Sequence, residues 1–408
     1  MLKSKFKKFK SALSKIQHGL ITGCADNDPA GITTYSIVGA TTGLTQLFIV
    51  PVSTIFLVVI QSICARIGDV KKCGLACTIR QHFGPKIAFV SMFLLILANL
   101  TTIGADFAAI GAAFNLLFPQ INTFFVLPLV AFFIWYLVVF KSYKTISRFL
   151  LLLCLIFIAY IFSAFLAKPD WGLVVKNTFI PQFDFSYKLY WIALVGFLGT
   201  TITPYLFFWQ VSEEVEDGPS VKDAKNEVGK NAPGFIFSNL IAYFIVICTA
   251  TVLFANHLQI SSAHEAALAL KPFLGENAFL LFALGIIGAG LLALPVLTSS
   301  TAYVVAETFN WPEGLTKKPS KARGFYTVLT ATFFIGLAIA FLRINPIKIL
   351  FYSQVFSGLL APFLLVLIML ISGNRQIMGN YRNSLWTNFL GWLTTIVMFL
   401  AGAAIFLS

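Results

Sequence analysis

Long apolar runs recur along the whole chain, and they decide what it can fold into. Each run has roughly 18 or more residues with few charges, enough for a helix to cross ~30 Å of hydrocarbon. The composition agrees, because 58% of the residues are hydrophobic and only 11% are charged, unlike a soluble domain. Lipid offers no hydrogen bonds to the backbone, so each crossing is expected to be helical. The sequence predicts eleven transmembrane helices, over residues 12–42, 46–68, 86–117, 122–140, 146–167, 187–214, 232–255, 275–307, 323–342, 346–372 and 384–407.

The net charge of +13 follows the predicted topology. With the N-terminus inside, 23 of the 29 Lys and Arg residues fall in cytoplasmic segments and six fall outside. This is the positive-inside pattern, and it predicts a cytoplasmic N-terminus and an external C-terminus. No basic patch is left for nucleic acid, and we expect no required protein partner. The compact chain and its short loops favour a prokaryotic inner membrane.

Two predicted spans contain a proline beside polar residues. The first is CADNDPAGITTY (residues 24–35), in which Asp28 precedes Pro29, and the second is GFLGTTITPYLFFWQ (residues 196–210), with Pro204. Placing a charged carboxylate in hydrocarbon costs at least a few kcal/mol of free energy, so a carboxylate at this depth is expected to have a function. A broken helix frees backbone carbonyls and helix ends, which together with a carboxylate make a cation site.

The two breaks stand five spans apart, at corresponding positions of two five-helix halves. Such a pair of interrupted helices is typical of an inverted-repeat transporter. The predicted fold class is therefore an all-α polytopic membrane protein with a LeuT-like 5+5 inverted repeat, in which helices 1 and 6 are broken. The predicted parts are a basic cytoplasmic segment (1–11), the first repeat (12–167), the second repeat (187–372) and an additional helix 11 (384–407). We expect the basic segment to be retained, because no cleavage site follows it.

Three acidic residues are predicted at membrane depth, namely Asp26, Asp28 and Asp106. An intramembrane acid can be satisfied by a neighbour or can serve function, and for Asp106 both interpretations stay open. The acidic run at 213–217 is expected to be a solvated face on the inner side. Cys73 and Cys77 share an inner loop without a second pair, so no zinc site is expected.

The sequence resembles the NRAMP family of divalent-metal transporters, in motifs that keep the family's order and spacing. Residues 28–31 (DPAG) align with its helix-one signature D-P-G-N, and residues 200–205 (TTITPY) align with its helix-six signature A-x-x-M-P-H. Further similarities lie in QSICARIG (61–68), LFALGIIGAG (281–290), TAYVVAE (301–307) and SQVFSGLLAPF (353–363).

The resemblance implies a metal site with ligands on three helices. The family's carboxylate carries over to Asp28, its helix-six carbonyl to Thr200, and the glutamine that joins in occluded states to Gln354. Two positions differ from the family's ligand pattern: Gly31 stands in place of its asparagine, and Thr203 stands in place of its methionine. The threonines could instead bond back to helix carbonyls near the break, and that alternative stays open.

The lost sulfur ligand favours hard cations, because oxygen and water ligands suit Mg²⁺, Ca²⁺ and Mn²⁺. Extra room at Gly31 suits an ion that keeps part of its hydration shell, as Mg²⁺ does. The resemblance is therefore closest to the NRAMP-related magnesium-transporter branch. We expect Mg²⁺ and Mn²⁺ as transported substrates, and no cofactor.

The family's proton-coupling residues do not carry over. Its helix-six histidine is Tyr205 here, and a tyrosine with a pKa near 10 is a poor proton carrier at neutral pH. On helix three only Asp106 is present, and its alignment to a family acid depends on a gap. We therefore expect weak or no coupling, with uptake driven by membrane potential. Asp26 and Asn27 precede the matched motif and are expected to line the vestibule, unless neighbouring backbone satisfies them.

Other functions remain as alternatives. A proton-coupled Mn²⁺/Fe²⁺ importer fits the same architecture. An organic-solute (amino acid) transporter also fits it, but Asp28 would repel a substrate carboxylate. A membrane enzyme would need a nucleophile with a base or a cluster of metal ligands, and the sequence shows neither. Sequence does not distinguish a carrier from a channel.

Overall fold

The computed structural model describes residues 23, 26–140, 158–218, 227–271, 275–342 and 344–407. Within these residues, nine helical segments are long and apolar enough to cross a membrane. Each matches a predicted span, with its ends within five residues of the prediction. The predicted spans 12–42 and 146–167 lie partly outside the described residues. The predicted segment 1–11 lies wholly outside them.

The spanning segments are α3 (Ile49–Lys71), α5 (Pro85–Leu117), α6 (Thr123–Phe140), α10 (Lys188–Thr201) with α11 (Pro204–Asp217), α12 (Glu227–Val252), α15 (Ala278–Phe309), α16 (Arg323–Ala340), α17 (Pro346–Gly373) and α19 (Leu385–Leu407). The described parts of the first and fifth predicted spans are α2 (Pro29–Thr42) and α8 (Ile158–Leu166). Short helices connect them, namely α4 (Leu75–Phe83), α9 (Trp171–Phe179), α13 (Ala263–Leu268) and α18 (Arg375–Met378).

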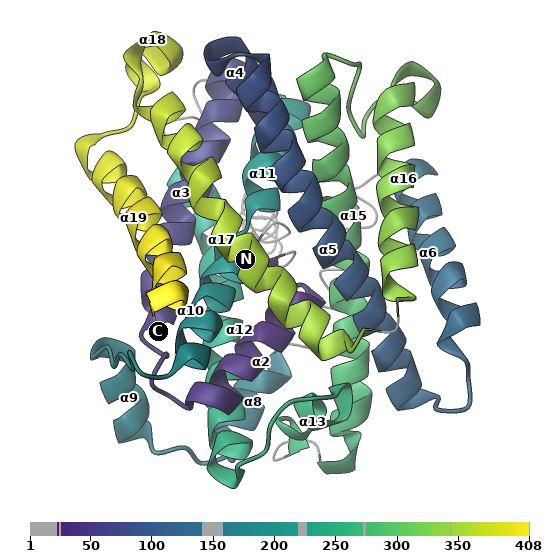
Figure 1. The fold of residues 1–408 in the computed structure, drawn as a ribbon, viewed down its shortest axis with the longest axis vertical. Helices are drawn as coiled ribbons and strands as arrows, with labels where there is room; N and C mark the ends of the chain where they lie inside the picture. Colours follow the sequence, from purple (N-terminus) through teal and green to yellow (C-terminus); the bar gives the residue numbers. More distant parts are fainter. Residues whose placement is uncertain are drawn as a thin grey trace, which may run out of the picture.

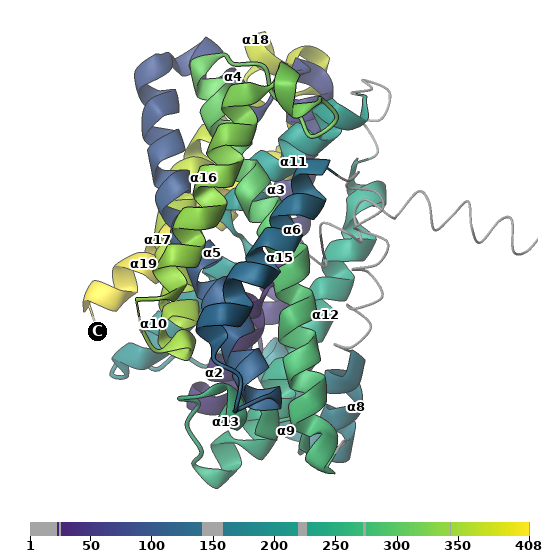
Figure 2. The same cartoon turned by 90° about the vertical axis from the view of Figure 1, so that its right-hand side faces the viewer.

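The two helices that begin at a break lie in the middle of the bundle. Figure 1 shows α2, α10 and α11 surrounded by the longer helices, with α6 and α16 on one side and α19 on the other. Figure 2 shows α6 and α16 on the face turned to the viewer. Burial agrees, because 94% of the most apolar window of Lys188–Asp217 is buried, against 22% for Thr123–Phe140. The polar breaks are thus shielded from lipid, whereas α6 presents phenylalanines outward.

The connecting segments sort to the two ends of the bundle as the charge pattern predicts. The short helices α4 and α18, predicted to be cytoplasmic, lie at one end, and α9 and α13, predicted to be external, lie at the other (Figure 1). By the positive-inside rule we expect the end with α4 and α18 to face the cytoplasm. We call this the inner end.

The acidic run at 213–217 is not the solvated face that the sequence predicts. Glu216 accepts hydrogen bonds from the Tyr303 hydroxyl and from the amides of Leu315 (2.6 Å) and Thr316 (3.2 Å). The end of α11 is therefore fixed to α15 and to the loop that follows it. Only Asp217 in this run is exposed.

Candidate metal site

The first break places a carboxylate at the start of α2. Asp28 is the N-cap of the helix, Pro29 occupies its first position, and the Asp28 Oδ1 accepts a hydrogen bond from the Gly31 amide at 2.5 Å. Proline suits this position because its missing N–H would be unpaired there anyway. Asp26 is helical, whereas Asn27 and Asp28 are not, so the chain is interrupted where the sequence predicts.

The second break separates α10 from α11. The helix α10 ends at Thr201, Ile202 and Thr203 are non-helical, and α11 begins at Pro204 with Thr203 as its N-cap. The Thr201 hydroxyl donates back to the Phe197 carbonyl at 3.0 Å, so for this threonine the back-bonding interpretation holds. Thr200 and Thr203 are buried at the break as well.

The two breaks meet at Gly31. A Cβ built on this glycine would lie 2.8 Å from the Thr200 Oγ1, 3.0 Å from the Asp28 Oδ1 and 3.3 Å from the Asp26 carbonyl oxygen. Three of the expected ligand positions, Asp28, Gly31 and Thr200, are therefore in direct contact. Oxygen atoms from two helices converge there.

The other two expected ligand positions lie next to this contact. Gln354, on α17, is buried, and its carbonyl oxygen lies against Gly199, where a Cβ would overlap it. Its side-chain amide donates to the Ser353 hydroxyl at 3.5 Å. In the part of the chain that the structure describes, neither Gln354 nor Thr203 hydrogen-bonds to Asp28.

Three buried carboxylates surround the break. Asp28 is close enough to repel both Asp26 and Asp106 electrostatically, and the exposed fractions of the three side chains are 2%, 1% and 0%. Asp106, on α5, also lies beside Ala30. The described residues that are buried include no Lys, Arg or His. Because a buried charge is costly unless it is paired or binds a metal ion, this arrangement calls for a cation.

The residues expected near the vestibule are also brought to this place. Tyr205 is buried and lies close enough to Asp28, Asp26 and Asp106 to interact with them electrostatically. Asp26 accepts a hydrogen bond from the Ser238 hydroxyl at 3.2 Å, and the Asn27 amide donates to the Ser238 carbonyl at 3.5 Å. Asp26 and Asn27 thus face α12, on which Ser238 lies.

Two residues at the site escaped the sequence analysis. Tyr35 is buried, lies close enough to Asp26 and Asp28 to interact with their charges, and packs its ring 5.0 Å from that of Phe197. Its seven-residue spacing from Asp28 places both on one helix face, and this signal could have found it. Ser238 is a single serine in an apolar span, and nothing in its local sequence marks it.

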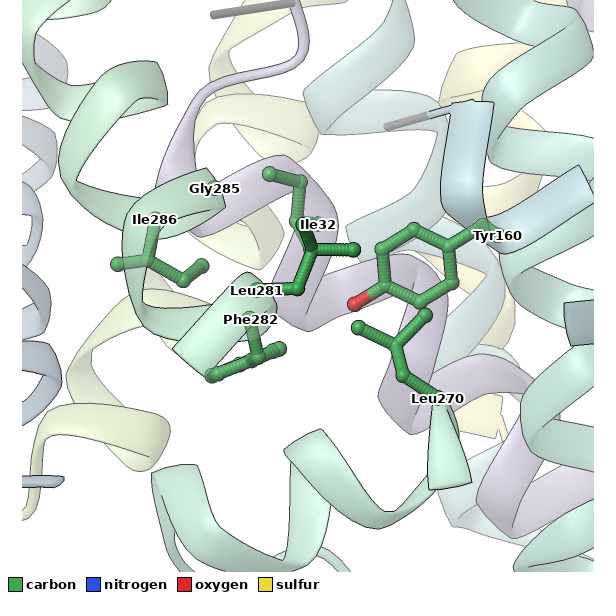
Figure 3. Close-up of a pocket in the computed structure, with 7 residues that line it drawn as sticks. All are labelled: Ile32, Tyr160, Leu270, Leu281, Phe282, Gly285 and Ile286. Atoms are coloured by element: carbon green, nitrogen blue, oxygen red, sulfur yellow. The ribbon is translucent and has the colours of Figure 1, made fainter. Parts of the chain in front are cut away.

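A narrow apolar pocket lies beside the site, next to Gly31 along α2. Figure 3 shows its lining, in which the Tyr160 hydroxyl is the polar side-chain group. One hydroxyl among apolar side chains offers no ligand set for a cation. The lining residues are Ile32, Tyr160, Leu270, Leu281, Phe282, Gly285 and Ile286.

Comparison with known proteins identifies relatives over nearly the whole chain. Residues 19–408 match the model of the Nramp family, described as natural resistance-associated macrophage protein-like. Two Staphylococcus aureus proteins, from strains bovine RF122 / ET3-1 and JH9, are named divalent metal cation transporter MntH. Each is 27% identical over 410 residues, covering 95% of this chain and 89% of the relative.

Solved structures show the same fold. A manganese transporter of Eremococcus coleocola, in complex with an aromatic bis-isothiourea substituted compound, superposes with a TM-score of 0.76 at 19% identity, over 97% of this chain and 86% of the other. A nucleobase-cation-symport-1 family transporter in a closed conformation superposes with a TM-score of 0.63 at 15% identity, over 96% and 90%. These likenesses confirm the predicted fold class, an all-α polytopic membrane protein with a LeuT-like fold.

Proposed function

This chain belongs to the Nramp family, and from that membership we propose that it carries divalent metal cations across the membrane by alternating access. It is an integral membrane transporter and not an enzyme. The substrates proposed are Mg²⁺ and Mn²⁺, with weak or no proton coupling. A cytoplasmic N-terminus, an external C-terminus and a prokaryotic inner membrane are part of the proposal.

One observation carries this function. Asp28, Asp26 and Asp106 gather at a helix break inside the bundle, and no Lys, Arg or His is among the described buried residues. A divalent cation supplies the missing positive charge. Asp28, the Thr200 carbonyl and, in an occluded state, Gln354 are the proposed ligands, with Thr203 and Gly31 completing the site.

The donor atoms at the site support the proposal that the transported ion is a hard cation. The residues at the contact offer carboxylate, hydroxyl and carbonyl oxygens, and Thr203 stands where the family pattern has a methionine. Hard cations prefer oxygen ligands, and Mg²⁺ keeps several of its waters when bound. An asparagine at residue 31 would collide with Thr200 and Asp28, so Gly31 contributes no side-chain ligand and lets these oxygens approach each other.

A proton-coupled Mn²⁺ importer is the second candidate function. It is favoured by the relatives, which are named divalent metal cation and manganese transporters. Asp106 is a buried carboxylate beside Asp28, and it is the described group best placed to accept a proton when the metal leaves. Against coupling stands Tyr205, which occupies the position of the family's histidine and is a poor proton carrier at neutral pH.

Membrane potential is sufficient to drive uptake without protons. Each elementary charge gains about 2.3 kcal/mol per 100 mV, and a divalent ion gains about twice that. Coupling to a proton is therefore not required for accumulation in a cell with an inside-negative potential.

Uptake of Mg²⁺ and Mn²⁺ into liposomes that contain the purified protein tests the proposal. Asp28→Asn keeps the size of the side chain and removes its charge, and we expect uptake to fall at least tenfold. Asp184→Asn is the matched control, because Asp184 is exposed and lies outside the spanning helices. If Asp28→Asn transports like the control, the proposed site is wrong.

A further inference from the structure

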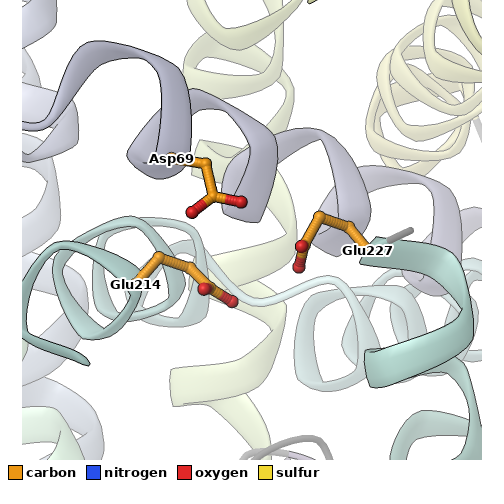
Figure 4. Close-up of side chains that lie close together, drawn as sticks. All are labelled: Asp69, Glu214 and Glu227. Carbon is orange, nitrogen blue, oxygen red and sulfur yellow. The ribbon is translucent and has the colours of Figure 1, made fainter. Parts of the chain in front are cut away.

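Three carboxylates from three helices converge at the inner end, away from the helix breaks. Asp69 lies near the end of α3, Glu214 lies on α11 and Glu227 begins α12. A carboxylate oxygen from each lies within 4.8 Å of the others, and Figure 4 shows the three side chains pointing toward one another. Glu214 stands ten residues after Pro204, about 15 Å along the helix at ~1.5 Å per residue.

Burial distinguishes this cluster from an ordinary acidic surface. Asp69 is 1% exposed, Glu227 is 2% exposed and Glu214 is half-buried. Like charges held this close repel, and the repulsion grows as water is removed. Arg66, on α3, interacts electrostatically with Glu227. The acids also have polar partners of their own, so the inference rests on how their oxygens converge and on the next residue.

Gln210 is a buried amide next to the cluster. It lies one helical turn before Glu214 on α11, and its Nε2 donates to the Glu214 Oε1 at 3.1 Å. The Gln210 side chain is 2% exposed, and its Oε1 accepts no hydrogen bond from the part of the chain that the structure describes. A buried amide oxygen without a partner costs free energy, and a bound cation would remove that cost.

We propose that Asp69, Glu214, Glu227 and Gln210 form a second divalent-cation site at the inner end. Carboxylate and amide oxygens are the ligands that Mg²⁺, Mn²⁺ and Ca²⁺ take in proteins. An ion bound there ties α11, the second half of the broken helix, to α3 and α12. The inference borrows only the class of ion from the proposed function, and its residues are separate from Asp28.

Counting bound Mn²⁺ tests the site without reference to transport. Mn²⁺ is added to the purified full-length protein, and free Mn²⁺ is measured by electron paramagnetic resonance. We expect two ions per wild-type chain and one in Asp28→Asn. Adding Glu214→Gln to Asp28→Asn is expected to weaken the remaining site at least tenfold. Adding Asp217→Asn instead should leave that site intact, because Asp217 is exposed on the same helix.

The number of Mn²⁺ ions bound by each variant tests the second site separately from the proposed transport site. If wild type binds one ion and Asp28→Asn binds none, the second site does not exist, while the transport site stands. If one ion remains in Asp28→Asn and survives both Glu214→Gln and Asp69→Asn, the proposed ligands are wrong. If Glu214→Gln does not fold, Gln210→Ala replaces it, with a measurable loss of affinity expected.

Discussion

Gly31 and Thr200 touch across the two helix breaks, and a Cβ on the glycine would lie 2.8 Å from the threonine Oγ1. Such a contact is tighter than a side chain tolerates without movement of its neighbour. The absent side chain therefore allows the two breaks to approach beside Asp28, and the extra room expected from the sequence at Gly31 is taken up by Thr200 and Asp28. We regard this as the main structural consequence of a glycine at this position.

Gly31→Ala tests whether transport depends on this close approach of the two breaks. The added methyl group would collide with the Thr200 Oγ1 and displace it from Asp28, so we expect Mg²⁺ uptake to fall several-fold while the protein still folds. Uptake into proteoliposomes and a thermal unfolding scan measure the two effects. Unchanged Mg²⁺ uptake in a folded variant would show that transport does not depend on the contact between Gly31 and Thr200.

Thr203→Met tests the argument from ligand softness. A thioether prefers soft and borderline cations, so we expect the ratio of Cd²⁺ to Mg²⁺ uptake to rise at least tenfold. Thr203→Val is the matched control, because it removes the hydroxyl without adding sulfur. Equal selectivity in the two variants would mean that residue 203 does not contact the ion.

Cys73 is predicted to react as a thiolate near neutral pH. A hydrogen bond with the Cys77 thiol, and then the Thr78 hydroxyl and the charges of Lys71 and Arg80, lower the pKa of Cys73 to about 6 against the effect of burial. The thiolate forms above the pKa, so alkylation by iodoacetamide should be fast at pH 7 and should slow as the pH falls through about 6.

Mass spectrometry of the labelled peptide follows this reaction. Cys77 serves as the internal comparison, because its hydrogen bond with Cys73 and its burial raise its pKa. We expect Cys73 to be labelled first, and Cys64, which is fully buried, to be protected. Labelling of Cys73 that begins only above pH 8 would contradict the assignment.

Glu307 is predicted to stabilise the inner end by capping α4 from another helix. The buried Glu307 carboxylate accepts hydrogen bonds from the amides of Ala76 (2.8 Å) and Cys77 (3.3 Å) and from the Ser212 hydroxyl (2.9 Å). Glu307→Ala leaves these donors buried and unpaired, and we expect a loss of about 1–3 kcal/mol. Thermal unfolding in detergent measures the loss, and Ser212→Ala, which removes one donor, should cost less.

The helices could be predicted because the signal that defines them is local. A span is a long apolar run bounded by charges, and the breaks at Pro29 and Pro204 are marked by their own residues. Both prolines begin helices in the structure, with Asp28 and Thr203 as N-caps. The resemblance to one family then predicted which residues would meet.

The contacts between distant helices could not be predicted in the same way. Ser238 holds Asp26 and Asn27 from α12, and a single serine in an apolar span carries no local sign of that role. The run at 213–217 looks solvated in sequence, because charged residues usually are. Its partial burial follows from the packing of α3 and α15 against α11, which only the fold reveals.

Simultaneous measurement of metal uptake and internal pH tests the central claim most directly. Proteoliposomes with an inside-negative potential receive Mg²⁺, with and without Mn²⁺ as competitor, while a trapped dye reports pH. The account predicts saturable Mg²⁺ entry that grows with the potential, is inhibited by Mn²⁺ and leaves the internal pH unchanged. Mn²⁺ entry with acidification, and no entry or competition by Mg²⁺, would contradict it.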